Sequence, residues 1–143
     1  HYYLVGNHEN YDDMSTLRVD RIAHITVLSE RRKPLREIKG YQQQRTFNVS
    51  QYVKEHIYMF GGESITVSFK AKRSIVNQIL DWFDGNVEFS DVTPDDVVCR
   101  VRVNHHAFKY WALQYMQSVK VLSPASLVTE VKEAIKEGLQ QYS

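Results

Sequence analysis

The sequence predicts an α+β protein made of two modules that meet at Gly61-Gly62. Apolar residues alternate with polar ones over residues 65–69 and 97–103, a spacing typical of strands with one buried face. Over residues 76–83 apolar residues recur at i, i+3, i+4 and i+7, which is typical of an amphipathic helix. We therefore assign residues 1–60 to one module and residues 61–143 to a second.

The second module is predicted to follow the order β-α-β-β-α-β-α. After the strand at 65–69 and the helix at 76–83, Asp84-Gly85-Asn86 predicts a turn, and Val87 and Phe89 begin a second strand. A strand at 97–103, a helix at 108–116 and a short strand at 119–121 follow. With right-handed crossovers, this order predicts a four-stranded antiparallel sheet with both helices on one face, the ferredoxin-like arrangement.

A further C-terminal helix is predicted after Ser123-Pro124, with the serine as its cap and the proline in its first turn. Its expected buried stripe comprises Leu127, Val131, Ala134, Ile135, Leu139 and Tyr142.

The first module is predicted to contain strands at 2–6 and 17–28, joined by a polar turn at 7–13. Period-2 spacing of Leu17, Val19, Ile25 and Val27 supports the second strand, with a bulge between the two pairs. A helix is expected over 49–57, with Asn48 or Ser50 as its cap. Two strands are too few to close a barrel by themselves.

Composition limits the functional classes. The 143 residues carry a net charge of +1, so the global basic field of a dedicated DNA-binding domain is missing. No apolar run approaches the roughly 18 residues of a membrane-spanning helix. The single cysteine, Cys99, excludes an internal disulfide and any multi-cysteine metal site, and suits a reducing cytosol.

Positive charge is nevertheless concentrated between residues 31 and 45, where Glu37 is the one acid. This basic cluster comprises Arg31, Arg32, Lys33, Arg36, Lys39 and Arg45. It is interpreted either as a solvated surface or as a surface for an anion or nucleic acid.

Arg18, Asp20 and Arg21 form the most unusual local group, because charged residues are depleted in strands with apolar neighbours. The two arginines could hold a phosphate through forked hydrogen bonds, with Asp20 orienting one of them. The alternative is an internal Arg–Asp pair that only stabilises the fold. On a strand, Arg18 and Asp20 would share one face. Tyr2 and Tyr3 would point to opposite faces of their strand, so that one ring enters the core and the other is free to stack on a base.

Enzyme and metal functions are disfavoured. His105-His106 are adjacent, so their side chains diverge by about 100° on a helix and do not chelate as an i, i+4 pair would. Cap or interface roles are the better interpretation. The acidic residues Asp81, Asp84, Asp91, Asp95 and Asp96 lack the spacing of an EF-hand, and phosphate-loop, dinucleotide and hydrolase motifs are not found. We expect no catalytic activity, no metal and no cofactor.

Several segments, taken in order, resemble the C-terminal part of a WYL-domain bacterial transcription regulator. Tyr2-Tyr3-Leu4 resembles the family's aromatic-Tyr-Leu strand, and residues 17–22 resemble its basic strand, although Ser15 stands where an arginine is often found. Residues 61–143 are similar to the extension that commonly follows a WYL domain. Its landmarks here are residues 59–63, Asp84-Gly85, Trp111 and residues 119–124.

The resemblance implies that residues 1–60 are the C-terminal part of an SH3-like β-barrel plus a connecting helix. It implies a cytoplasmic region that senses an effector and dimerises, with Tyr2, Tyr3, Arg18, Asp20 and Arg21 as ligand residues. The ligand would be anionic, either single-stranded nucleic acid or a nucleotide, and the basic cluster would assist. A helix-turn-helix domain and further barrel strands are expected upstream, so operator DNA would be bound only through that domain. A purely structural oligomerisation module and a small-molecule effector domain remain the alternatives.

Overall fold

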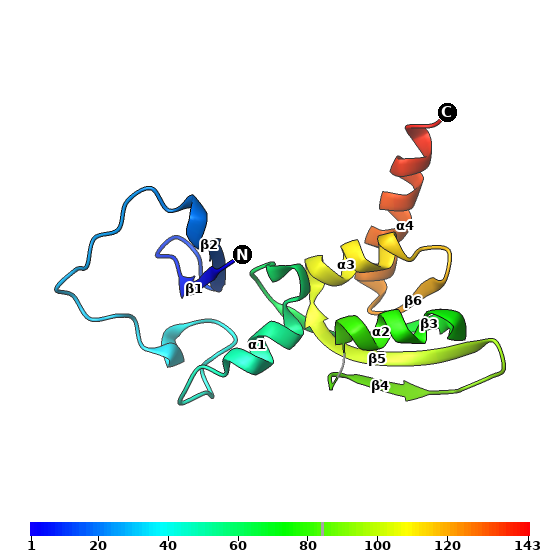
Figure 1. The fold of residues 1–143 in the computed structure, drawn as a ribbon, viewed down its shortest axis with the longest axis horizontal. Coiled ribbons are helices and arrows are strands. Elements are labelled where there is room, and N and C mark those ends of the chain that lie inside the picture. Colours follow the sequence, from blue (N-terminus) through cyan, green and yellow to red (C-terminus); the bar gives the residue numbers. More distant parts are fainter. Residues whose placement is uncertain (84) are drawn as a thin grey trace.

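The computed structural model describes residues 1–83 and 85–143, and it shows a mixed α+β chain with two antiparallel sheets and four α-helices (Figure 1). The predicted turn at Asp84-Gly85-Asn86 includes Asp84, which lies outside the described residues. The strands are β1 (Tyr3–Asn7), β2 (Met14–Arg18), β3 (Ser64–Lys72), β4 (Val87–Ser90), β5 (Asp96–Asn104) and β6 (Val119–Ser123). The helices are α1 (Val49–Glu55), α2 (Val76–Phe83), α3 (His105–Gln114) and α4 (Ala125–Gln140).

The second module has the element order that the sequence predicts. Its sheet has the strand order β4-β5-β3-β6, and every neighbouring pair is antiparallel. Phe69 of β3 lies opposite Cys99 of β5 and Val121 of β6, so these side chains share one face. All three are buried, as the alternation in the sequence predicts.

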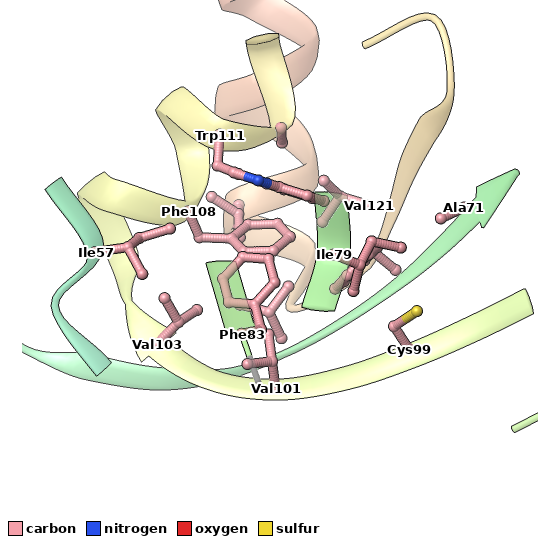
Figure 2. Packing of buried hydrophobic residues seen from close by; sticks show 14 of the residues in the cluster. Ile57, Ala71, Ile79, Phe83, Cys99, Val101, Val103, Phe108, Trp111 and Val121 are labelled. Carbon is pink, nitrogen blue, oxygen red and sulfur yellow. The ribbon is translucent and has the colours of Figure 1, made fainter. Parts of the chain in front are cut away.

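An aromatic core fills the space between this face and the helices. Phe69, Phe83, Phe108 and Trp111 contact one another with ring centroids 4.8 to 6.3 Å apart. Figure 2 shows Phe83, Phe108 and Trp111 of this core. Helices α2 and α3 therefore lie on the same side of the sheet (Figure 1). Tilted and edge-on ring pairs add stability beyond area burial alone.

Asn104 ends β5 and begins α3, and its side chain is fully buried. Its Oδ1 accepts a hydrogen bond from the Ala107 amide at 3.0 Å, which caps the helix. Its Nδ2 donates to the carbonyl oxygens of Gly61 and Glu63 at 3.1 and 3.3 Å. One side chain thus joins the start of α3 to the segment that connects the two modules.

Helix α4 differs from the prediction in two respects. Ser123 is the last residue of β6 and Pro124 occupies the N-cap without a side-chain hydrogen bond, so the predicted serine cap is wrong. The predicted buried stripe is buried only at Leu127 and Val131, whereas Ile135, Leu139 and Tyr142 are exposed. The reason is length, because α4 projects beyond the sheet that covers its first turns (Figure 1).

The first module has a small sheet in which β1 and β2 pair antiparallel, from Tyr3 opposite Arg18 to Asn7 opposite Met14. The strand predicted at 17–28 is wrong in its bounds, since β2 ends at Arg18 and a 3-10 helix follows over Val19–Arg21. Residues 22–28 form neither helix nor strand, and Val27 is 93% exposed. Apolar alternation alone cannot form a strand here, because no neighbouring strand accepts its hydrogen bonds.

A second, smaller core holds this module together. Its buried members are Met14, Ile38 and Tyr52. Helix α1 is capped by Asn48, one of the two predicted candidates, whose Oδ1 accepts a hydrogen bond from the Gln51 amide at 3.0 Å. The two modules meet where Gly61 passes β2, because a Cβ added at Gly61 would lie 2.9 Å from the Met14 carbonyl oxygen.

In the part of the chain that the structure describes, the strands form no closed barrel. None of the helices described is both long enough and apolar enough to cross a lipid bilayer.

Candidate functional site

Arg18 and Asp20 form an internal pair. Arg18 ends β2 and Asp20 lies in the 3-10 helix that follows, so the aspartate turns back toward the guanidinium. Arg18 Nε donates to Asp20 Oδ1 at 3.0 Å, and Arg18 Nη2 donates to Oδ2 at 2.5 Å. This hydrogen-bonded pairing raises the pKa of Arg18 and lowers the pKa of Asp20. The pair is exposed, so its contribution to stability is small.

The other predicted ligand residues of this module lie on the surface. Arg21 is exposed at the end of the 3-10 helix rather than on a strand face. Tyr2 is 86% exposed and Tyr3 is 36% exposed, so the prediction that one of them enters the core is wrong. The small core of this module explains the difference, since it is built around Met14, Ile38 and Tyr52 and includes neither Tyr2 nor Tyr3.

The basic cluster is divided by the fold. Arg31, Arg32, Arg36 and Arg45 line one open concavity of about 810 Å³ together with Pro34, Leu35 and Gln42 to Gln44. We call this the arginine concavity. Its lining residues include no acidic side chain. Lys33 lies elsewhere, with its Nζ 3.2 Å from Asn7 Oδ1, and Lys39 lines a different pocket.

That different pocket lies at the junction of the two modules and has a volume of about 220 Å³. We call it the junction pocket. Its charged lining residues are Asp13, Lys39, Glu55, Glu63 and Arg102, and its neutral ones include Tyr41, Gln44, Gln51, Tyr52, His56 and Ser64. Arg102 Nε lies 3.4 Å from Glu55 Oε1, an ion pair that links β5 to α1.

Buried polar groups surround this pocket. Burial raises the pKa of Tyr41 and of Tyr52. The Ser64 hydroxyl oxygen is buried without a hydrogen-bond partner among the described residues. His56 is buried, with Nδ1 2.8 Å from the Tyr52 carbonyl oxygen and Nε2 3.2 Å from that of Gly62. The sequence did not indicate this pocket, because its lining residues are spread along the chain from Asp13 to Arg102.

His105, one of the two adjacent histidines, contacts another helix. His105 Nε2 lies 2.9 Å from Glu130 Oε1, which joins α3 to α4 and fits an interface role. That hydrogen bond lowers the pKa of Glu130. Within residues 1–83 and 85–143, no group of three or more His, Cys, Asp and Glu side chains is placed to hold a metal ion.

Comparison with known families identifies the second module. The family model for the WCX domain, a WYL-related domain, matches residues 61–139. No curated protein matches the chain. The matched range begins at Gly61, where the sequence predicts the module boundary, and ends within α4. The match covers more than half of the chain, which therefore belongs to the WCX-domain family.

Proposed function

We propose that this chain is the effector-sensing and dimerisation region of a cytoplasmic bacterial transcription regulator. In this proposal its ligand is anionic, either nucleic acid or nucleotide-like. Residues 1–60 would be part of an SH3-like barrel, and the WCX domain would be ferredoxin-like. The observation that carries the proposal is the arginine concavity, where four arginines line one space whose lining includes no acidic residue.

The chemistry of this concavity fits phosphate. Guanidinium groups donate forked hydrogen bonds that match phosphate oxygens, and they stay charged at every physiological pH. The side-chain amides of Gln42, Gln43 and Gln44 add neutral donors and acceptors on the same lining. A nucleotide would therefore find charge neutralisation and polar contacts in one place.

Arg18 and Arg21 are expected to contribute differently to ligand binding. Two donors of Arg18 are already hydrogen-bonded to Asp20, so a ligand would have to share the guanidinium with that carboxylate or displace it. Arg21 is exposed, and among the described residues no carboxylate lies within 4.0 Å of its guanidinium. Tyr2 is exposed enough to stack on a base. We infer that Arg21, rather than Arg18, contacts the ligand first.

Dimerisation is proposed to involve α4. The apolar stripe that packs inside the domain at Leu127 and Val131 continues at Ile135, Leu139 and Tyr142 on the projecting part of the helix. The same stripe on a second copy would cover it by isologous, two-fold pairing. Replacing Ile135 and Leu139 by glutamate is expected to convert a dimer into a monomer in light scattering, with the circular dichroism of the domain unchanged.

The proposed response is conformational. The two modules are joined by the Arg102–Glu55 ion pair and by the close passage of Gly61 along β2. A ligand that binds one relative position of the modules better than another shifts the population toward that position. In a dimer this would alter the spacing of the DNA-reading domains.

The test measures binding of a nucleoside monophosphate, a five-nucleotide single strand and a duplex to the whole chain at several salt concentrations. In Arg36→Gln/Arg45→Gln, loss of two phosphate contacts would weaken single-strand binding about 25-fold at 0.1 M salt, since each contact contributes about 0.7 log units. Lys132→Gln/Lys136→Gln on the exposed side of α4 removes the same charge and is the matched control. Equal binding by both variants would contradict the proposal.

Two alternatives have specific support. The closed Arg18–Asp20 pair is what a purely structural oligomerisation module would show. The junction pocket, at about 220 Å³, has room for a small polar molecule and would suit a small-molecule effector domain. Dimerisation that persists in a chain binding no ligand of any class would favour the first alternative.

A further inference from the structure

The junction pocket is lined by charged groups that the protein does not pair internally. Arg102 and Glu55 neutralise each other through their ion pair at 3.4 Å. The charged lining residues that remain are Asp13, Lys39 and Glu63. Among the described residues, neither of the two carboxylates has a cationic nitrogen within 4.0 Å, and Lys39 has no carboxylate within that distance. Two carboxylates and one ammonium group are thus available to a bound molecule.

These three residues come from both modules. Asp13 directly precedes β2, and Lys39 follows the 3-10 helix over Leu35–Glu37, so both belong to the first module. Glu63 directly precedes β3 of the WCX domain. Asp13 is half-buried, whereas Lys39 and Glu63 are exposed. A molecule that contacted all three would bridge the two modules and could enter the pocket from solvent.

Two neutral lining residues add polar groups. The Ser64 hydroxyl oxygen is buried and has no hydrogen-bond partner among the described residues, which costs free energy that a hydrogen bond to a ligand would recover. Burial raises the pKa of Tyr41, and the neighbouring Tyr52, Glu55 and Asp13 raise it further. The Tyr41 phenol therefore stays protonated at neutral pH and keeps its hydroxyl as a donor.

The size of the pocket restricts the ligand. Its volume of about 220 Å³ would hold about seven water molecules at about 30 Å³ each. This is smaller than the roughly 300 Å³ at which the pockets of drug-sized ligands begin. A single amino acid is a suitable size, whereas an oligonucleotide is too large.

We propose that the junction pocket binds a free basic amino acid, such as lysine or arginine, between the two modules. Such a molecule carries one carboxylate and two cationic groups, which is the opposite of the charges that the pocket offers. Its carboxylate would contact Lys39, and its two cationic groups would contact Asp13 and Glu63 through charge-assisted hydrogen bonds. A phosphate group, in contrast, would be repelled by the two carboxylates.

This inference goes beyond the proposed function and does not rest on it. The ligand of the junction pocket is cationic or zwitterionic, whereas that of the arginine concavity is anionic. Gln44 is the one residue that lines both.

The first test varies the ligand and uses isothermal titration calorimetry on the whole chain. L-Norleucine lacks the side-chain ammonium group of L-lysine, and cadaverine lacks the carboxylate. Lysine should bind at least about 10-fold tighter than either, which is the effect of one charge-assisted hydrogen bond. Equal affinity of lysine and norleucine, or of lysine and cadaverine, would overturn the assigned ligand class. So would the absence of binding by lysine and arginine at about 10 mM.

The second test varies the protein. Asp13→Asn/Glu63→Gln removes both negative charges with little change of shape, so lysine affinity should fall at least about 10-fold and the preference for lysine over norleucine should be lost. The matched control is Asp81→Asn/Glu133→Gln, which changes exposed acids of α2 and α4 outside the pocket and should leave lysine affinity unchanged. Equal effects of the two double variants would overturn the proposal.

The failure of this inference is distinguishable from failure of the proposed function. Arg36→Gln/Arg45→Gln should bind lysine as the unmodified chain does. Nucleotide binding by a chain that binds no basic amino acid would overturn the pocket and leave the arginine concavity intact. Lysine binding that requires Asp13 and Glu63, in a chain that binds no nucleotide, would support the pocket and contradict the proposed function.

Discussion

Asn104 offers the sharpest test of how the two modules are held together. Replacing it by alanine removes the α3 cap, which costs about 1 kcal/mol. The same change leaves the carbonyl oxygens of Gly61 and Glu63 without their side-chain donor in a buried place, which costs about 2 kcal/mol. We expect Asn104→Ala to lower the free energy of unfolding by about 3 kcal/mol.

The matched variant is Asn104→Ser, because serine caps a helix about as well as asparagine but is too short to reach both carbonyl oxygens. It should cost about 2 kcal/mol, so that the difference between the variants reports the cap. Urea denaturation followed by tryptophan fluorescence measures both, since Trp82 and Trp111 lie in or against the core of the WCX domain. A loss below about 1 kcal/mol for Asn104→Ala would refute the assigned role of the buried amide.

Three further predictions concern single contacts. Gly61→Ala should destabilise the chain and disturb β2, because the added Cβ would lie 2.9 Å from the Met14 carbonyl oxygen. Urea denaturation and amide chemical shifts measure both effects, and Gly6→Ala, where no atom lies within 4 Å of the added Cβ, is the control. Burial raises the pKa of Cys99 to about 11, so its thiol should react with a maleimide at pH 8 only after unfolding, and rapid labelling of the native chain would contradict its position. Because Arg18 lowers the pKa of Asp20, the ion pair is favoured above the ordinary aspartate pKa of 3.8 and is lost as pH falls. In Arg18→Gln, carboxyl titration by NMR should show the Asp20 pKa rising toward 3.8. An unchanged Asp20 pKa would argue against the pair in solution.

The sequence was most informative where local pattern and tertiary packing agree. Alternation along β3 and β5 correctly predicts which side chains are buried, because a strand between two neighbours has both edges hydrogen-bonded and one face on the core. The α1 cap at Asn48 was also predictable, since a cap depends on a side chain and an amide three residues away.

The candidate sites were predictable only in part. Composition indicated the basic cluster, and the fold gathers four of its six members while it places Lys33 and Lys39 elsewhere. The junction pocket was not predicted from sequence. It depends on residues from strands, loops and helix α1, and the tertiary fold rather than spacing along the chain brings them together.

By itself, the sequence determined the α+β class and the element order of residues 61–143, because these follow from residue periodicity and turn chemistry. Only the tertiary structure decided that β2 ends at Arg18, that Val27 is exposed and that the apolar stripe of α4 is buried only at Leu127 and Val131. The physical reason is the same in each case. An apolar or strand-forming pattern indicates which face of a segment can be buried or which edge can pair. The fold decides whether a hydrophobic surface or a neighbouring strand lies beside that segment.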